Sequence, residues 1–237
     1  MEECGIDLRA SCQEADIKTL MKEKGYEETL DFHVDNIYNS NYTPIFYNPV
    51  KLGLVESSYY RYRHHAPGIS DEDKSSKGIT WAVFNTCDNR KFIVINTHMC
   101  TQSDFPRLQQ ARELCAISDT LTKKYPYVPI LLGGDFNTVL GSRTYAHFIE
   151  HGFEDAIFVS RGFSARQKGH HAYPVFDEKI GYMVYNGELS GTFEGSVDHI
   201  LYTNACENFC ICSYGVIINK LARACSDHSP AFVDFTF

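Results

Sequence analysis

The sequence predicts an α/β protein, because apolar stretches typical of strands alternate with segments of helical periodicity along the chain. No low-complexity linker and no internal repeat interrupts the 237 residues. Hydrophobic residues make up 43% and charged residues 22% of the chain, which is ordinary for a globular protein. A chain of this length can bury a substantial core without the support of disulfides.

The elements of the N-terminal part are predicted from periodicity and from turn residues. Gly25 is expected to end a short helix over 17–24, and the segment 43–47 (TPIFY) is typical of a strand. The polar segment 71–77 (DEDKSSK) predicts an exposed loop. Two strands, over 79–85 and 91–96, are expected to form a hairpin around Asp88 and Asn89.

The clearest helical pattern covers 105–124, where apolar residues recur every three or four positions along one face. The short apolar run 128–132 (VPILL) suits a strand that is buried on both faces, and Gly133 and Gly134 are expected to end it. The remaining expected elements are a helix over 142–150, an irregular functional segment over 161–191, and strands over 197–203, 211–218 and 231–237.

The net charge of −8 bears on the class of ligand. Proteins that grip long stretches of DNA usually carry a basic surface, so this charge argues against tight, nonspecific binding of duplexes. It is compatible with a cluster of carboxylates that holds a metal ion. No run approaches the ~18 apolar residues needed for a transmembrane segment.

The nine cysteines are odd in number, show no disulfide-like framework and follow no apolar leader. They predict reduced thiols in a reducing compartment, the cytoplasm. Three of them, Cys206, Cys210 and Cys212, lie close together, but a zinc site would need a fourth ligand such as Cys225 or a histidine. Their CxxxCxC spacing matches no common zinc module, so small buried side chains on strands are the expectation.

The strongest local motif is Gly-Gly-Asp135-Phe-Asn137, which follows the buried run 128–132. At the end of a strand, a carboxylate and an amide two residues apart can point into one cleft. A carboxylate there can help to hold Mg²⁺ or accept a proton from water, and an amide can bind a phosphate oxygen or the nucleophile. A simple Asp/Asn turn is the alternative interpretation of this motif alone.

Four further polar motifs are weak when taken singly. His98 follows an apolar strand, where a structural histidine is the commoner finding. Asp198 lies inside an apolar strand, and a buried carboxylate is costly unless it is paired or metal-bound, so a histidine is its natural partner. The remaining two motifs are Gln-Glu14 near the start, which an exposed glutamate would equally explain, and Ser-Asp227-His228 before the last strand.

In combination these motifs are far more specific, because QE, NTH, GGDFN, VDHI and SDH occur in this order and mostly at strand ends. The chain thereby resembles the endonuclease/exonuclease/phosphatase superfamily of DNase I-like proteins over about 6–237. The resemblance implies a single domain over 1–237, built as a four-layered α/β/β/α sandwich. Two mixed β-sheets then lie face to face with helices outside, and the active cleft lies at one end of the sheets.

The resemblance also implies the roles of individual residues. Glu14 matches the family's metal-binding glutamate and Asp227 a second acid of the metal site, for which Mg²⁺ is the expected ion and Mn²⁺ a possible replacement. The five other matching residues are catalytic: Asp135 and Asn137 orient water and phosphate, Asp198 pairs with His228, and His98 contacts the phosphate.

One departure from the family pattern concerns the N-terminus. Family members begin with a strand that carries an asparagine well upstream of the QE motif, whereas thirteen residues precede Glu14 here. The first strand and its asparagine are therefore expected to be missing, and the chain to be N-terminally truncated relative to the family. The loss of a sheet strand would expose an edge.

The predicted function is Mg²⁺-dependent hydrolysis of a phosphate ester, with a small molecule, a lipid head group or a nucleic acid as the binding partner. The acidic charge favours a small or lipid-like phosphate. A nuclease for DNA or RNA is the alternative, and it would need a basic groove with aromatic side chains such as Tyr59, Tyr60 or Trp81, although core packing explains Trp81 better. A non-catalytic binding protein is the third possibility, which the retained acids and histidines disfavour. The sequence does not predict an oligomeric state.

Overall fold

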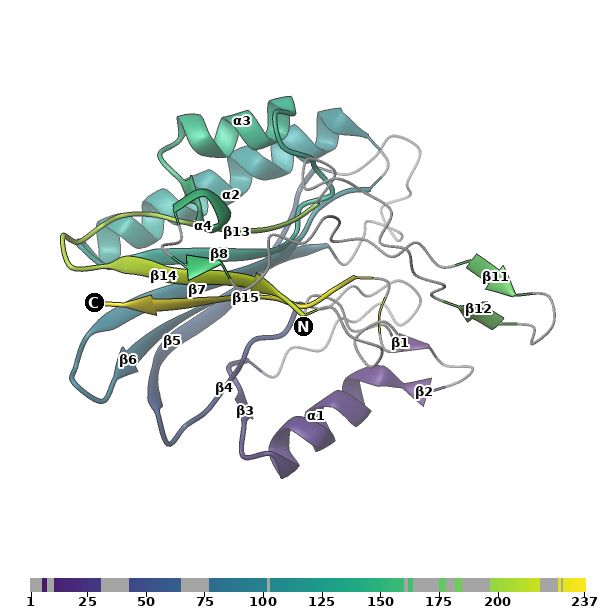
Figure 1. Ribbon diagram of the computed structural model, residues 1–237, viewed down its shortest axis with the longest axis horizontal. Helices are drawn as coiled ribbons and strands as arrows, with labels where there is room; N and C mark the ends of the chain where they lie inside the picture. The colour runs from purple at the N-terminus through teal and green to yellow at the C-terminus, as the bar shows by residue number, and fades with distance from the viewer. Residues whose placement is uncertain are drawn as a thin grey trace.

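A six-stranded mixed sheet forms the centre of the computed structural model (Figure 1). The structure describes residues 6–7, 11–30, 43–64, 77–101, 103–159, 162–163, 175–177, 182–184, 197–217, 226 and 228–237. The strands of the large sheet are, in spatial order, β5 (Leu52–Arg61), β6 (Gly78–Thr86), β7 (Lys91–His98), β8 (Ile130–Asp135), β13 (Asp198–Tyr202) and β9 (Glu154–Asp155).

All neighbours in this sheet are antiparallel except β7 and β8, which run parallel. Parallel neighbours need a crossover connection, and here helix α2 (Asp104–Lys124) provides it. The helix crosses one face of the sheet beside α3 (Arg143–Glu150) (Figure 1). The α3 helix begins where the Ser142 hydroxyl accepts a hydrogen bond from the backbone N–H of Tyr145, a normal helix N-cap.

The two faces of the large sheet bury two separate clusters of apolar side chains. On the helix-covered face, Ile79, Ile93 and Leu132 pack with Leu114 of α2 and Phe148 of α3. Because neighbouring residues of a strand point to opposite faces, the residues between them point away from the helices. These residues form the second cluster, which includes Ala82, Phe84, Phe92 and Leu131.

A second, three-stranded sheet covers this other face. Its strands are β10 (Gly162–Phe163), β14 (Cys210–Val216) and β15 (Ala231–Thr236), with β10 parallel and β15 antiparallel to β14. Ile211 and Tyr214 of β14, with Phe235 of β15, pack into the second cluster. The described residues therefore form three layers, namely helices, a mixed sheet and a smaller mixed sheet, which confirms the predicted α/β class.

The other elements are short. They are β1 (Ile6–Asp7), β2 (Ser11–Cys12), α1 (Gln13–Glu23), β3 (Glu27–Glu28), β4 (Phe46–Tyr47), α4 (Ala156–Val159), β11 (Val175–Asp177) and β12 (Tyr182–Val184). The α1 helix contacts β1, β2 and β3. An outer helical layer on the three-stranded sheet, the fourth layer of the predicted sandwich, stays a prediction.

Two strands of the large sheet show where the structure differs from the sequence prediction. The long strand β5 was not expected, because its residues are half-exposed and alternate irregularly. The β8 strand was expected to stop at Gly133, yet it continues through both glycines to Asp135. No helix among the described residues is long and apolar enough to cross a membrane.

Candidate active site

Three neighbouring strands bring predicted site residues into one row at an end of the large sheet. His98, the last residue of β7, is the register partner of Asp135, the last residue of β8. Asp135 is in turn the register partner of Asp198, the first residue of β13. Backbone pairing thus sets three polar side chains next to one another, although they lie 37 and 63 residues apart in the sequence.

Gly134 makes this close arrangement possible. It is the register partner of Thr97, and a Cβ atom at Gly134 would lie 1.9 Å from the Thr97 carbonyl oxygen. Its φ of +139° is also a conformation that side-chain-bearing residues rarely adopt. At Gly133, by contrast, an added Cβ would have its nearest neighbour, the His199 carbonyl oxygen, at 3.9 Å. The second glycine of the motif therefore serves the contact between β7 and β8, not the end of a strand.

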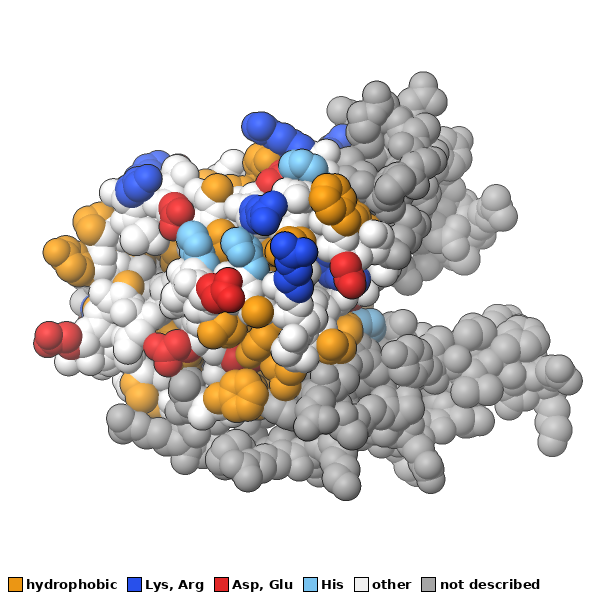
Figure 2. All heavy atoms as spheres, turned by 90° about the horizontal axis from the view of Figure 1, so that it is seen from above, with side chains coloured by type: hydrophobic (Ala, Val, Ile, Leu, Met, Phe, Trp, Pro, Cys, Tyr) orange, Lys and Arg blue, Asp and Glu red, His pale blue; other side chains and the backbone are white. Residues whose placement is uncertain are grey.

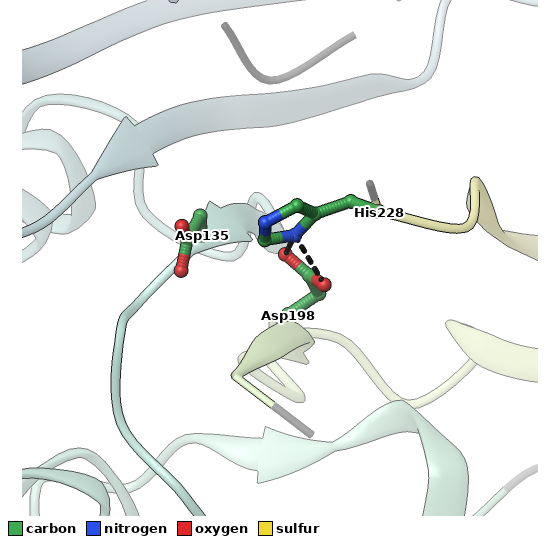
Figure 3. Close-up of side chains that lie close together, drawn as sticks. All are labelled: Asp135, Asp198 and His228. Carbon is green, nitrogen blue, oxygen red and sulfur yellow. Dashed lines mark hydrogen bonds and ion pairs between the residues drawn. The ribbon is translucent and has the colours of Figure 1, made fainter. Parts of the chain in front are cut away.

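Asp198 and His228 form an ion pair beside Asp135. The Nδ1 atom of His228 lies 3.0 Å and 2.9 Å from the two carboxylate oxygens of Asp198, and the far edge of the ring is directed toward Asp135 (Figure 3). Asp198 is buried, whereas the His228 side chain is 29% exposed. Among the side chains that the structure describes, Asp135, Asp198 and His228 are the group of potential metal ligands whose ligand atoms lie within 4.8 Å of one another.

Asn137 holds the carboxylate of Asp135. Its backbone N–H donates to Asp135 Oδ1 at 2.7 Å, and its Nδ2 donates to Asp135 Oδ2 at 3.1 Å and to the Met99 carbonyl at 3.0 Å. A left-handed backbone conformation, with φ of +49°, turns Asn137 back toward Asp135. The amide therefore uses both of its N–H groups inside the protein, and its Oδ1 atom is the acceptor that it can offer to water.

The charge state of Asp135 reflects its surroundings. Burial raises the pKa of Asp135, and the nearby negative charge of Asp198 raises it further. His228, the Asn137 N–H and Lys77 oppose this rise in part, and the resulting pKa is about 7. A carboxyl with such a pKa can exchange a proton near neutral pH.

His98 is buried on the other side of Asp135, with its Nε2 atom 3.5 Å from Asp135 Oδ2. The same nitrogen contacts the ammonium of Lys77, which also donates to the Met99 carbonyl at 2.9 Å. Burial, then the positive charge of Lys77, then that of His228 hold the pKa of His98 well below its usual range. The imidazole of His98 is therefore neutral at physiological pH.

The structure thus brings five of the seven predicted residues together: His98, Asp135, Asn137, Asp198 and His228. The backbone of Glu14 lies in α1, but its side chain is outside the described part of the structure, and Asp227 lies outside it altogether.

Lys77 is the residue at this site that sequence reasoning missed. It ends the charged segment 71–77, which was expected to be exposed, yet it is 8% exposed. Its place directly before an apolar strand is a weak local hint, and the pairing of that strand with β7 is what brings Lys77 level with the loop after His98.

Two other groups of candidate residues do not join this site. Cys206, Cys210 and Cys212 are partly exposed free thiols, and among the described side chains they belong to no cluster of potential metal ligands. Tyr60 and Trp81 pack against the core on the helix-covered face. For Trp81 this is the role that the sequence favoured.

A second Asp–His pair lies on the opposite face of β13. His199 Nδ1 is 3.4 Å from Asp155 Oδ2, and its Nε2–H donates to the Thr138 carbonyl at 2.8 Å. The Tyr145 hydroxyl donates to the same Asp155 oxygen at 3.1 Å. This network connects β13 and β9 to the segment that follows Asn137. It therefore stabilises the strand ends of the site from the helix-covered face of the sheet.

Comparison with solved structures reveals proteins of the same fold. A mannosyl-6-phosphatase from Bacteroides thetaiotaomicron is 21% identical with a TM-score of 0.70, and the match covers 95% of this chain and 81% of that one. The human Nocturnin catalytic domain, solved with a bound sulfate anion, is 17% identical with a TM-score of 0.63, covering 93% and 75% of the two chains. At these identities the likeness establishes the fold and not the substrate.

Sequence comparison adds a curated relative and a family. A probable 3′-5′-exoribonuclease subunit Ccr4 of the CCR4-Not complex from Enterocytozoon bieneusi is 22% identical over 125 residues, or 51% of this chain. The match spans about a quarter (26%) of that relative's length. The model of the endonuclease/exonuclease/phosphatase family matches residues 29–228, which is most of the chain. The chain therefore belongs to the endonuclease/exonuclease/phosphatase family of DNase I-like proteins.

Proposed function

We propose that this chain is a metal-dependent hydrolase of phosphate ester bonds. The observation that carries the proposal is the convergence of Asp135, Asp198 and His228, whose ligand atoms lie within 4.8 Å of one another at the end of the large sheet. Asp135 and Asp198 are both buried, and two neighbouring buried carboxylates are costly unless cations compensate them.

The described residues fit a divalent cation. Burial, and then the charge of Asp198, raise the pKa of Asp135 to about 7, and a cation beside both carboxylates would offset this penalty on their charged forms. Carboxylate oxygens are ligands that suit Mg²⁺ and Mn²⁺. We assign Glu14 and Asp227 to the ion by resemblance, with Asp135 beside them. When bound, the ion polarises a phosphoryl oxygen and offsets charge on the leaving group.

The protein's own groups supply the rest of the mechanism. Asp135 accepts a proton from the attacking water, while Asn137 fixes the Asp135 carboxylate through two hydrogen bonds and offers its Oδ1 atom to that water. Asp198 binds Nδ1 of His228 and orients the ring. The edge of the His228 ring that faces Asp135 then contacts the phosphate and stabilises the charge that builds up on it.

A small or lipid-like phosphate ester is the substrate class that we favour. The net charge is −8. On the face that α2 and α3 cover, the described Lys and Arg side chains are interspersed with acidic and histidine side chains rather than gathered in a stripe (Figure 2). A nuclease is the second candidate, and the match to an exoribonuclease subunit over 51% of the chain favours it.

We also propose that residues 1–237 form a single domain with the four-layered arrangement and that the protein is cytoplasmic. The family match over residues 29–228, and the core shared by the two sheets, support the single domain.

Release of nitrophenol from bis(p-nitrophenyl) phosphate tests the proposed function. Activity should require Mg²⁺ or Mn²⁺, disappear with EDTA, and fall by about 10²–10⁴-fold in Asp135→Asn, the range for loss of a general base. The matched control is Asp119→Asn, which removes an exposed carboxylate that pairs with His151 on the helix-covered face. Metal-independent turnover, or an Asp135→Asn variant as fast as the control, would refute the proposal.

The substrate class is tested separately. Rates on a sugar phosphate and on a single-stranded RNA oligonucleotide should be compared under the same metal conditions. Faster cleavage of the oligonucleotide would reverse the order of the two candidates.

A further inference from the structure

Lys77 is a buried cation built into the site, and the resemblance to the family assigned no residue to this position. Its ammonium contacts Nε2 of His98 and donates to the Met99 carbonyl at 2.9 Å. The pairing of β6 with β7, in which Ile79 is the register partner of Thr97, places the residue before β6 level with the loop after His98. A lysine is almost never this buried unless its ammonium is bound to partners. The contacts with His98 and Met99 therefore account for the burial of Lys77.

The chemistry of the two side chains fixes the direction of their hydrogen bond. A lysine ammonium carries three N–H donors and no acceptor. The His98 nitrogen that it contacts must therefore accept through its lone pair, which places the imidazole proton on Nδ1. His98 Nδ1 is itself buried. In this arrangement His98 presents no N–H group at Nε2, the nitrogen that lies nearest to Asp135.

The position of the ring limits how the carboxylate of Asp135 can turn. His98 Nε2 lies 3.5 Å from Asp135 Oδ2, and Asn137 donates to both oxygens of the same carboxylate. The carboxylate is thus in contact with both the His98 ring and Asn137. Movement of the ring would loosen one of these two contacts.

We propose, on the basis of the proposed phosphoesterase function, that Lys77 is a positioning residue that fixes the tautomer and orientation of His98, which in turn keeps the Asp135 carboxylate in its reactive position. His98 then acts as a support for Asp135 and not as an Nε2–H donor to the phosphate. Lys77 acts through His98, as residues behind the reacting groups do in metal sites, where their loss typically costs about 10–100-fold in activity.

A double-mutant cycle tests the dependence of Lys77 on His98. Lys77→Met should lower kcat by about 10–100-fold with KM changed by no more than about threefold, and Lys77→Arg should restore part of the rate. In a His98→Asn background, Lys77→Met should cost nothing further, because the group through which Lys77 acts is gone. Independent, multiplying losses in the double variant would overturn the proposal.

A spectroscopic readout separates this proposal from the proposed function. Imidazole ¹⁵N–¹H correlation spectra, with the His98 signals identified by their loss in His98→Asn, should show the Nδ1–H tautomer in the unaltered protein and its loss in Lys77→Met. Thermal melts of each variant verify folding. An Nε2–H tautomer in the unaltered protein would overturn the role of Lys77 even if the enzyme hydrolysed phosphate esters. The Nδ1–H tautomer in a protein without hydrolase activity would instead refute the proposed function, while the effect of Lys77 on the His98 tautomer would still stand.

Discussion

Strand β13 contributes to two Asp–His pairs, one on each of its faces. The pairs contain the same two residue types but differ in burial and in their other hydrogen-bond partners. Asp198 and His199 are neighbours in the chain, so the strand sends their side chains to opposite faces. Asp198 pairs with His228 at the end of the sheet, where the histidine is 29% exposed. His199 pairs with Asp155 beneath α3, where both side chains are almost fully buried.

The difference lies in the partners that remain. In the buried pair the other groups are already bound: His199 Nε2 donates to the Thr138 carbonyl, and Asp155 accepts from the Tyr145 hydroxyl and from the backbone N–H of Ile157. In the site pair Asp198 binds Nδ1 of His228, and the far edge of the ring faces Asp135 (Figure 3). The same two residue types therefore stabilise the fold where both are enclosed, and are placed to react where the histidine is partly exposed and faces a second carboxylate.

The largest expected effect comes from the site pair. Asp198→Asn should lower kcat on bis(p-nitrophenyl) phosphate by about 10²–10⁴-fold, because an amide cannot balance the charge of a protonated His228. The thermal midpoint should change less than for the buried pair, because the His228 side chain is 29% exposed and water can replace part of the lost interaction. Steady-state kinetics beside a thermal melt would measure both, and a variant with undiminished kcat would remove this pair from the mechanism.

Gly134→Ala should have the second-largest effect. This variant tests whether the site pair depends on the contact between β7 and β8. The new Cβ would overlap the Thr97 carbonyl, so the strands must separate, at a cost of roughly 2–4 kcal/mol in the free energy of unfolding. Activity should fall with the register of Asp135. Gly133→Ala, whose Cβ has room, is the matched control for urea denaturation. Equal stability of the two variants would contradict the role of the second glycine.

The buried pair should respond in the opposite sense from the site pair. Asp155→Asn weakens the hydrogen bonds from Tyr145 and Ile157, and should lower the free energy of unfolding by about 1–3 kcal/mol. The kcat of the folded protein should stay within a few-fold of the unaltered value. Urea titration and kinetics on the same sample decide the matter, since a large loss of kcat without loss of stability would place Asp155 in the reaction.

The smallest expected effect concerns Glu113 of α2, a less buried carboxylate with a tyrosine partner like that of Asp155. Burial raises the pKa of Glu113, but hydrogen bonds from the Tyr60 hydroxyl, the His64 ring and the backbone N–H of Arg63 outweigh burial, and the pKa lies below its ordinary value of 4.5. A carboxyl whose pKa is lower in the folded state stabilises the fold above pH 4.5, and this stabilisation is lost as the pH falls through the folded-state value.

Glu113→Gln should therefore reduce the difference in unfolding free energy between pH 7 and pH 3.5 by about 1 kcal/mol. Urea denaturation at the two pH values measures it. An unchanged difference would mean that Glu113 titrates in the folded protein as it does in the unfolded chain.

The sequence predicted the parts of the fold whose residues have clear periodicity. Strands β6 and β7 and helix α2 were expected within a few residues of their observed bounds. Strand β5 was missed, because a half-exposed strand of irregular alternation resembles a loop. The end of β8 was misplaced, because a glycine pair usually breaks a strand, whereas Gly134 is needed where two backbones come close.

The candidate site was predictable to the extent that its residues lie in short motifs. The order of the motifs identified Asp135, Asn137, Asp198, His228 and His98, although it did not show that strand register aligns three of them. Lys77 was missed because burial of a charged residue depends on tertiary neighbours that a local sequence does not reveal. The second Asp–His pair went unnoticed for the same reason, since Asp155 belongs to a two-residue strand without a pattern.

His98, Asp135 and Asp198 lie on strands that are neighbours in the sheet, and this has a consequence for how the substrate of such a protein can change in evolution. Neighbouring strands are about 4.8 Å apart, a spacing set by main-chain hydrogen bonds and insensitive to side-chain identity elsewhere. The geometry of the reacting groups is thereby insulated from the loops that surround them. Loops tolerate insertions and substitutions far better than strands do. A change of substrate in this scaffold therefore calls for new loops around an unaltered row of strand ends.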